Sequence, residues 1–205
     1  MPLLATCVAA VAVVFAAGCG ASLPTRAPEG PTPAQMIEAR MAEDAGFAWD
    51  ARRPLAWTDF QGPPPAEAGG VAAETAYALV HGVRCTGTAF EFHVAAVFRP
   101  GTSWVRPSMF RTPDDGARAL RHEQTHFDLT EVHARRLRRY FAELFAPCQV
   151  PTSDLTSMAE RIGQAEKAAQ AQYDADTGNG RIPAQQARWD REVAAQLVAL
   201  NGFAR

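Results

Sequence analysis

Apolar and polar residues alternate along two stretches in the first half of the chain. In residues 89–98, phenylalanine and aliphatic side chains alternate with polar ones such as Glu91. A period of two residues is typical of a strand with one buried face, and residues 71–83 have a similar character. The polar residues 85–88 are expected to form the turn of a β-hairpin. A third short strand is expected at 103–105.

The second half of the chain has the longer apolar period of helices. Thirty or so residues without proline are followed by Pro147, and further capping residues mark two later starts. Strands therefore precede helices, which predicts an α+β fold with a small antiparallel sheet. Three helices are expected: from Asp114 or Asp115 as N-cap to about Phe145, from Ser153 as N-cap to about Tyr173, and from Pro183 to about Asn201, with a loop at 174–182.

Two shorter segments precede the hairpin. Residues 34–48 carry a weak helical pattern, and residues 54–65 are rich in aromatic residues and end in three prolines. Proline lacks the backbone N–H that helices and central strands use. We expect a short helix in the first segment and an extended chain, opening the main domain, in the second.

The N-terminus has the features of an exported lipoprotein. Residues 3–18 are almost wholly apolar, but they are fewer than the roughly 20 needed to span a bilayer. The small residues 16–18 lead into Cys19, which resembles the site at which bacterial lipoproteins are cleaved and acylated. Gly20 resembles the pattern for sorting to the outer membrane, facing the periplasm. The alternatives are a plain signal peptide or an uncleaved anchor.

Composition narrows the choice of partners. The chain has 205 residues, enough for one domain of ordinary size, and 20 Lys and Arg balance 22 Asp and Glu. The formal net charge of -2 gives no overall field that attracts nucleic acid, so a nucleic-acid partner is not expected. The oligomeric state is left open by these data.

The four cysteines agree with export. Removal of Cys7 with the signal peptide and acylation of Cys19 would leave an even pair, Cys85 and Cys148. We expect one disulfide between them, because exported proteins fold under oxidising conditions. Two buried free thiols are the alternative.

The longest predicted helix contains the motif His-Glu-x-x-His. His122 and His126 are four residues apart, which places both imidazoles on one face, roughly 6 Å from each other. This arrangement presents two nitrogen ligands to one Zn²⁺, and Glu123 is then the general base of a metal-assisted hydrolysis. The alternative is a helix whose two histidines pair with carboxylates on its surface.

A wider set of residues resembles a known family. The stretch 120–131, which reads LRHEQTHFDLTE, follows LAWTDFQGPP at 55–64 and precedes YDADT at 173–177. Together they resemble a bacterial family described as predicted secreted zinc-dependent proteases, long catalogued as a domain of unknown function. The resemblance covers roughly residues 54–200. It implies an exported, gluzincin-like metallopeptidase.

A third zinc ligand is harder to assign. His133 is too far along an unbroken helix from the other two histidines, and Glu131 points to the opposite side. The family pattern implies a histidine where this chain has Asn179. We therefore expect Asp174 to be the third ligand, with Asp176 as a second possibility. The alternative for Asp174 is a carboxylate that stabilises a turn.

Two neighbouring features complete these expectations. Tyr173 is expected to donate a hydrogen bond to the oxyanion of the reaction. The arginines between 135 and 139 are expected to form a solvated face near the helix C-terminus.

These observations lead to one functional hypothesis and one rival. The first is a membrane-tethered, exported zinc metallopeptidase that hydrolyses peptide bonds, with a protein or peptide as substrate. The rival is a non-enzymatic envelope lipoprotein, an interaction or scaffold module with a relic or structural metal site. The expected divisions are a signal peptide at 1–18, a lipidated cysteine and disordered proline-rich tether at 19–33, a helical lead-in at 34–53, and the metallopeptidase-like domain at 54–205.

Overall fold

A long β-hairpin lies at the centre of the fold, which the computed structural model describes for residues 30–67 and 69–204. Strands β3 (Tyr77–Thr86) and β4 (Ala89–Phe98) pair antiparallel over their full lengths. Gly87 joins them with φ +61°, a left-handed conformation that glycine adopts without steric cost. The strand predicted at 89–98 is confirmed, and β4 forms the most buried part of the sheet because its last five residues are all buried.

The strand expected at 71–83 is divided in two. Strand β2 (Ala73–Glu74) pairs antiparallel with β5 (Trp104–Val105), so these two form a separate small sheet. The backbone N–H of Ala76 donates to the side chain of Ser103 instead of continuing a ladder. The chain therefore changes partner between β2 and β3, which an alternating pattern alone does not reveal.

The first helix covers one face of the hairpin. Helix α1 (Pro33–Glu43) begins at a capping box made by Thr32 and places Ile37 against the apolar side chains of β4. It ends earlier than the expected position 48: Ala45 takes a left-handed conformation with φ +49°, and a Cβ on Gly46 would lie 2.9 Å from the carbonyl oxygen of Phe98. The next residues form β1 (Phe47–Ala48), which pairs with the free edge of β4.

The aromatic segment at 54–65 is not wholly extended. It contains a short 3₁₀ turn at Trp57–Asp59, in which the Asp59 carboxylate accepts the backbone N–H of Ala56. Leu55 and Phe60 on either side of the turn are buried in the main core. The segment therefore opens the domain as expected, but as a turn anchored by two apolar side chains.

Helix α2 (Pro113–Ala142) packs against the other face of the hairpin. Its N-cap is Thr112, not Asp114 or Asp115, because the Thr112 hydroxyl accepts the N–H of Asp115 while the Asp115 carboxylate accepts the N–H of Thr112. The helix stops three residues before the expected end. Phe127, Leu137 and other apolar residues of α2 form the main core together with β4.

The last two helices complete the structure. Helix α3 (Thr152–Thr177) follows Pro151 directly, so Ser153 lies inside it and is not its N-cap. It continues past the expected end at Tyr173 and stops where Gly178 takes a left-handed conformation. Helix α4 (Pro183–Ala199) begins at the predicted proline. The residue Asp174 is therefore in the last turn of a helix and not in a loop.

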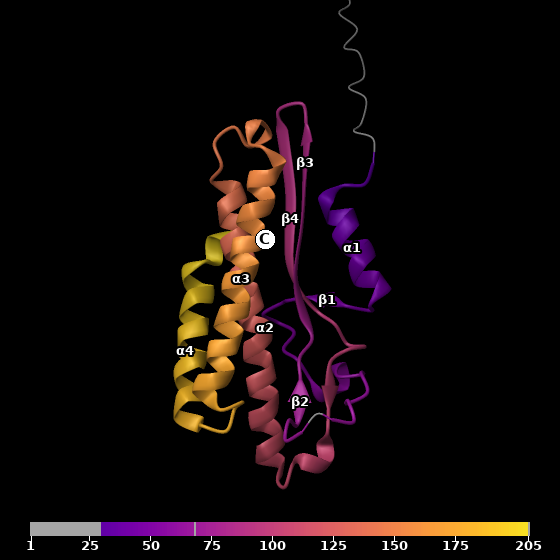
Figure 1. Ribbon diagram of the computed structural model, residues 1–205, viewed down its shortest axis with the longest axis vertical. Coiled ribbons are helices and arrows are strands. Elements are labelled where there is room, and N and C mark those ends of the chain that lie inside the picture. Colours follow the sequence, from indigo (N-terminus) through magenta and orange to yellow (C-terminus); the bar gives the residue numbers. More distant parts are fainter. Residues whose placement is uncertain (1–29, 68, 205) are drawn as a thin grey trace, which may run out of the picture.

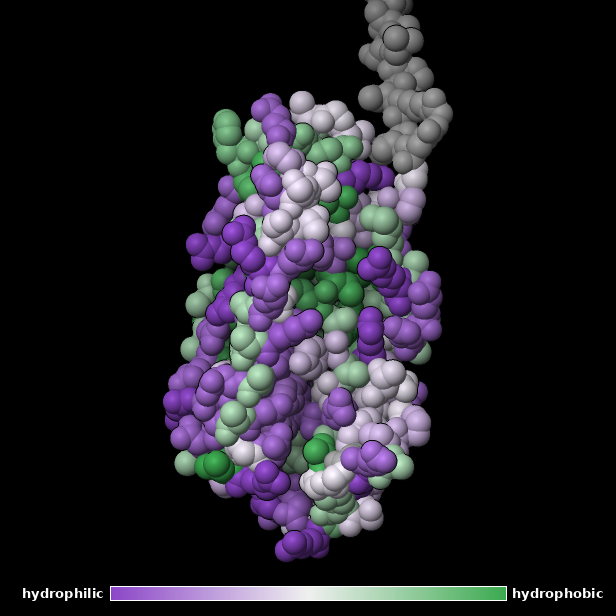
Figure 2. All heavy atoms as spheres, in the orientation of Figure 1, coloured by the Kyte–Doolittle hydropathy of each residue, from purple (hydrophilic) through white to green (hydrophobic). Residues whose placement is uncertain are grey.

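The elements stack in layers (Figure 1). The hairpin lies between α1 on one side and α2 on the other, and α3 and α4 pack against α2 from outside. Polar side chains cover much of the helical layer, while apolar ones gather between that layer and α1 on the face shown in Figure 2. The fold is thus α+β, with a small antiparallel sheet and four helices in the described part of the chain.

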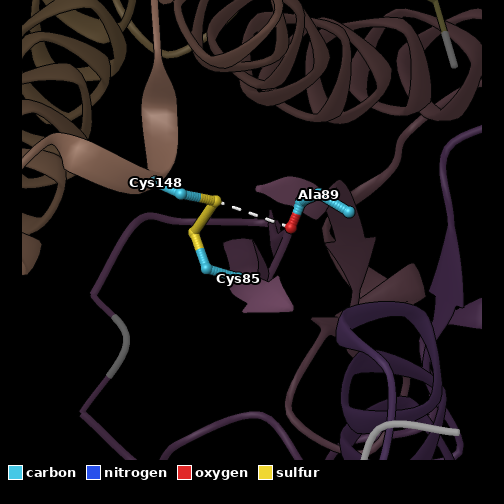
Figure 3. Close-up of a disulfide and its surroundings, with 3 residues drawn as sticks. All are labelled: Cys85, Ala89 and Cys148. Atoms are coloured by element: carbon cyan, nitrogen blue, oxygen red, sulfur yellow. Dashed lines mark hydrogen bonds between the residues drawn. A yellow bond between two sulfur atoms is a disulfide. The ribbon is translucent and has the colours of Figure 1, made fainter. Parts of the chain in front are cut away.

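A disulfide ties the hairpin to the helical layer (Figure 3). Cys85, near the end of β3, is bonded to Cys148, in the connection between α2 and α3, as predicted. The sulfur of Cys148 also lies 3.5 Å from the carbonyl oxygen of Ala89. At the same end of the molecule, the guanidinium of Arg84 donates to the carbonyl oxygen of Gly30, 3.2 Å away. The chain therefore enters the fold beside the disulfide.

The expectation of a solvated arginine face is wrong for two of its members. Arg135 and Arg138 are buried, and both pair with the buried carboxylate of Glu131, at 2.8 and 2.9 Å. Arg135 also donates to the carbonyl oxygen of Leu197, and Arg138 to that of Val94. These charges are buried because they hold α4 and the hairpin against α2 through several hydrogen bonds each.

The N-terminal expectations concern residues that are mostly not described. The signal peptide at 1–18, the lipidated Cys19 and the tether up to residue 29 lie outside the described residues. Helix α1 already includes Pro33, so the last position of the expected tether is helical. Among the helices that the structure describes, none combines the length and the apolar character needed to cross a membrane.

Candidate metal centre

Three side chains from two helices converge on one point. The Nε2 atoms of His122 and His126, on α2, lie 3.1 Å apart. The Oδ1 atom of Asp174, in the last turn of α3, lies 3.1 Å from the first and 3.0 Å from the second. Both histidines are buried, whereas the Asp174 side chain is 39% exposed. Two imidazole nitrogens and a carboxylate oxygen are a ligand set typical of catalytic zinc sites.

Two glutamines fix the orientation of the imidazole rings. The Nδ1 atom of His126 lies 2.7 Å from Oε1 of Gln170, and that of His122 lies 3.2 Å from Oε1 of Gln186. Since an amide oxygen only accepts hydrogen bonds, each Nδ1 donates its N–H to a glutamine. Both Nε2 atoms therefore face the point where Asp174 arrives, and each can bind a metal ion once it carries no proton.

These glutamines are absent from the sequence-based expectations. Gln170 is one helical turn before Asp174, and its amide nitrogen also donates to the carbonyl oxygen of His126. Gln186 is in the first turn of α4 and bonds to Asp190. Gln170 is four residues from Asp174, which is the only feature of the sequence that places it on the same helix face. No pattern in the sequence marks Gln186.

The charges at the centre favour an ionised carboxylate. Burial raises the pKa of Asp174, but the hydrogen bonds from His122 and His126 lower it more. The pKa of Asp174 therefore lies well below its usual range. Burial lowers the pKa of His126, whereas the bond to Asp174 and the nearby Glu123 raise it, with a net upward shift. The first shift favours the negative charge of Asp174 and the second favours the positive charge of His126, so the two groups stabilise each other as an ion pair.

Glu123 is held beside the centre by a threonine. Its Oε2 accepts a 2.7 Å hydrogen bond from the hydroxyl of Thr75, and both residues are buried. Thr75 directly follows β2, so the small sheet and not the hairpin positions this carboxylate. The His-Glu-x-x-His motif predicts a role for Glu123, whereas no pattern in the sequence relates it to Thr75, 48 positions away.

The converging side chains lie at the bottom of a cleft of about 780 Å³. Residues 70–75 form one wall, while the first turns of α2 and the connection from α3 to α4 form the other. The connection from α3 to α4 passes close over the site: a Cβ on Gly180 would lie 3.1 Å from the Cβ of His122, and Gly180 has φ +76°. Glycine is therefore required at this position.

Tyr173 does not face the cleft. It is fully buried, its ring stacks on that of His122 at 4.7 Å, and its hydroxyl bonds to Gln186 and to the carbonyl oxygen of His122. The expected role as an oxyanion donor is therefore wrong, and Tyr173 supports His122 instead. A different phenol, Tyr77 at the start of β3, lines the cleft, with its ring parallel to that of His126 at 6.3 Å.

The other residues considered as ligands have different partners. Asp176 accepts hydrogen bonds from Trp189 and Arg188. His133 bonds to the carbonyl oxygen of Leu129 and not to the centre. Asn179 lines the cleft in a left-handed conformation. Among the His, Cys, Asp and Glu side chains that the structure describes, only one group is arranged to hold a metal ion, and Asp174 is its carboxylate.

One known protein family matches this sequence. Residues 59–180 match the family described as "Bacterial protein of unknown function (DUF922)". The match contains all three converging residues, as well as Glu123, Thr75 and Gln170, and it stops before Gln186. Neither the curated proteins nor the solved structures gave a match. Because more than half of the sequence is covered, the chain belongs to the DUF922 family of bacterial proteins.

Proposed function

We propose that this protein is an exported zinc-dependent metallopeptidase. In this proposal His122, His126 and Asp174 hold Zn²⁺, and Glu123 is the general base that acts on water. The observation that supports it best is the convergence of the three ligand atoms at the bottom of a cleft, with Glu123 beside them. The family description carries no activity, so the proposal rests on the site alone.

The residues present fit a zinc ion. In a tetrahedral site with bonds of about 2.0 to 2.1 Å, two ligand atoms are roughly 3.3 Å apart. The three distances at the centre are 3.0 to 3.1 Å, so a small outward movement of the side chains would suffice. The hydrogen bonds that the other imidazole nitrogens donate to Gln170 and Gln186 resemble the outer contacts of established zinc sites.

The chain's own groups supply the remaining functions. When bound, Zn²⁺ would polarise a peptide carbonyl and lower the pKa of a water molecule to about 7. Thr75 holds one oxygen of the Glu123 carboxylate, which leaves the other to accept the proton of that water. Tyr77 presents a neutral phenol to the cleft and can donate a hydrogen bond to the developing oxyanion.

The wall opposite α2 suits an extended peptide. The carbonyl oxygen of Ala72 accepts the N–H of Arg106, and β2 pairs with β5 in the same register. In an antiparallel ladder alternate residues bond to the same neighbour, so the backbone groups of Ala73 point to the opposite edge, where the cleft lies. A substrate could add there as a further strand.

The compartment is part of the same proposal. The disulfide between Cys85 and Cys148 suits an oxidising environment such as the periplasm. We propose that lipid on Cys19 anchors the protein to the outer membrane with the domain facing the periplasm, and that its partners there are protein or peptide substrates.

Metal analysis combined with a peptide library tests the function. The purified protein should bind about one zinc per chain and cleave members of a proteome-derived peptide library, as read by mass spectrometry. Glu123→Gln should keep the zinc and lose turnover by at least two orders of magnitude, since only the base is removed. Zinc binding without cleavage of any peptide would refute the peptidase proposal and favour the non-enzymatic alternative.

A further inference from the structure

Three arginines surround the cleft. Arg111 lies just before α2 and Arg118 in its second turn, while Arg181 lies in the connection between α3 and α4, so they occupy two different segments of the wall. All three are exposed. The strand side of the cleft contributes small apolar residues such as Val71 and Ala73, and one exposed carboxylate, Glu74, which accepts a hydrogen bond from Trp104. The rim on the helical side therefore carries an excess of positive charge, with three arginines against Asp115, although the chain as a whole carries a net charge of -2.

These charges are only partly neutralised by the protein itself. Arg118 pairs with Asp115, but that carboxylate also accepts the backbone N–H groups of Arg111 and Thr112. Within the described residues, the guanidinium groups of Arg111 and Arg181 form no ion pair. Two of the three arginines are thus available to bind an anionic group on a ligand.

The arginines lie on one side of the candidate centre. Helix α2 rises about 1.5 Å per residue, which places Arg118 roughly 6 Å from His122 along the axis and the start of the helix about 14 Å away. An extended peptide advances about 3.3 Å per residue. A peptide bound along β2 would therefore bring its second to fifth residues from the scissile bond past these side chains.

We propose that the cleft selects peptides with acidic side chains two to five residues to one side of the cleaved bond. This inference rests on the proposed function. Arg111 and Arg181 bind the carboxylates, and Arg118 contributes after partial release from Asp115. A free C-terminal carboxylate would offer the same chemistry, so the experiment includes peptides of both kinds.

Peptide binding to zinc-loaded Glu123→Gln protein tests the selection without turnover. Labelled peptides that differ only in Glu or Gln at the second to fifth positions, on either side of a fixed central pair, are compared by fluorescence anisotropy. The Glu peptides should bind roughly three- to tenfold more tightly on one side only, which corresponds to one or two exposed ion pairs. A C-terminal amide should leave this ratio unchanged.

Charge-removing substitutions supply the decisive comparison. Adding Arg111→Gln and Arg181→Gln should abolish the preference, whereas Arg161→Gln, an exposed arginine on α3 outside the cleft, should not. Equal binding of the Glu and Gln peptides, or a preference that survives the double substitution, would overturn the inference. A preference that depends on a free C-terminus would also overturn it, in favour of terminal carboxylate recognition.

Cleavage by the wild-type protein separates this inference from the proposed function. If library peptides are cut without enrichment of Asp and Glu near the cut, the peptidase proposal stands and the selection is wrong. If no peptide is cut but acidic peptides bind as described, the binding of acidic side chains by the arginines stands and the peptidase proposal is wrong.

Discussion

The third ligand is the residue on which zinc binding depends most sensitively. Replacing Asp174 by alanine would remove one of three protein ligands while leaving both histidines and their glutamines in place. Structural zinc sites with four protein ligands contribute roughly 10 to 16 kcal/mol of binding free energy, or about 2.5 to 4 kcal/mol for each ligand. The zinc affinity of Asp174→Ala should therefore fall by roughly 70- to 900-fold.

Asp176→Ala is the matched control. It removes a carboxylate two residues away in the same helix turn, where the side chain bonds to Trp189 and Arg188 and not to the histidines. Its zinc affinity should change by less than threefold. Competition with a chromophoric chelator at fixed pH measures both affinities, and circular dichroism shows whether each variant is folded.

The result that would refute the reasoning is specific. If Asp174→Ala is folded and binds zinc as tightly as the wild type, the carboxylate is not a ligand. Its 39% exposed side chain contributes no apolar packing, so loss of folding is not expected to obscure the outcome.

Three further predictions concern stability and location. Burial raises the pKa of Glu166, whose Oε1 has no hydrogen-bond partner among the described residues. Its stabilising contribution is therefore greatest below the usual pKa of 4.5 and falls as pH rises, so Glu166→Gln should add about 1 kcal/mol of stability at pH 7 and little at pH 4 in urea unfolding. Replacing Cys85 and Cys148 by serine should cost about 4 kcal/mol in the same assay, given a loop of 63 residues; no loss would contradict the entropic argument. Cys19→Ala should abolish lipid labelling and release the protein from membranes, and unchanged membrane retention would refute the lipid anchor.

Local patterns predicted most of the elements. The alternation at 89–98 located β4 because this strand has a hydrophobic face along its whole length. The break between β2 and β3 could not be predicted, since it depends on the hydrogen bond from Ala76 to Ser103, a residue 27 positions later. Capping was misjudged for α2 because threonine and aspartate are both good caps, and only the reciprocal bonds distinguish them.

The candidate site could likewise be predicted only in part from the sequence. The spacing of His122 and His126 predicts one helical face, and the structure brings Asp174 to that face as expected; their roles as ligands stay predictions. Thr75 and Gln186 come from distant segments, so no sequence spacing reveals them. The burial of Arg135 and Arg138 was missed for a related reason: a helix wheel does not show that α4 covers that face.

The hydrogen bond from Arg84 to Gly30 determines how far the cleft lies from the N-terminal attachment of the domain. It fixes the point where the chain enters the fold at the disulfide end of the molecule. The candidate centre lies about 20 residues back along α2, which is roughly 30 Å from the end of that helix nearest Cys148. A lipid on Cys19 would therefore attach the domain to a membrane through the end that lies remote from the cleft.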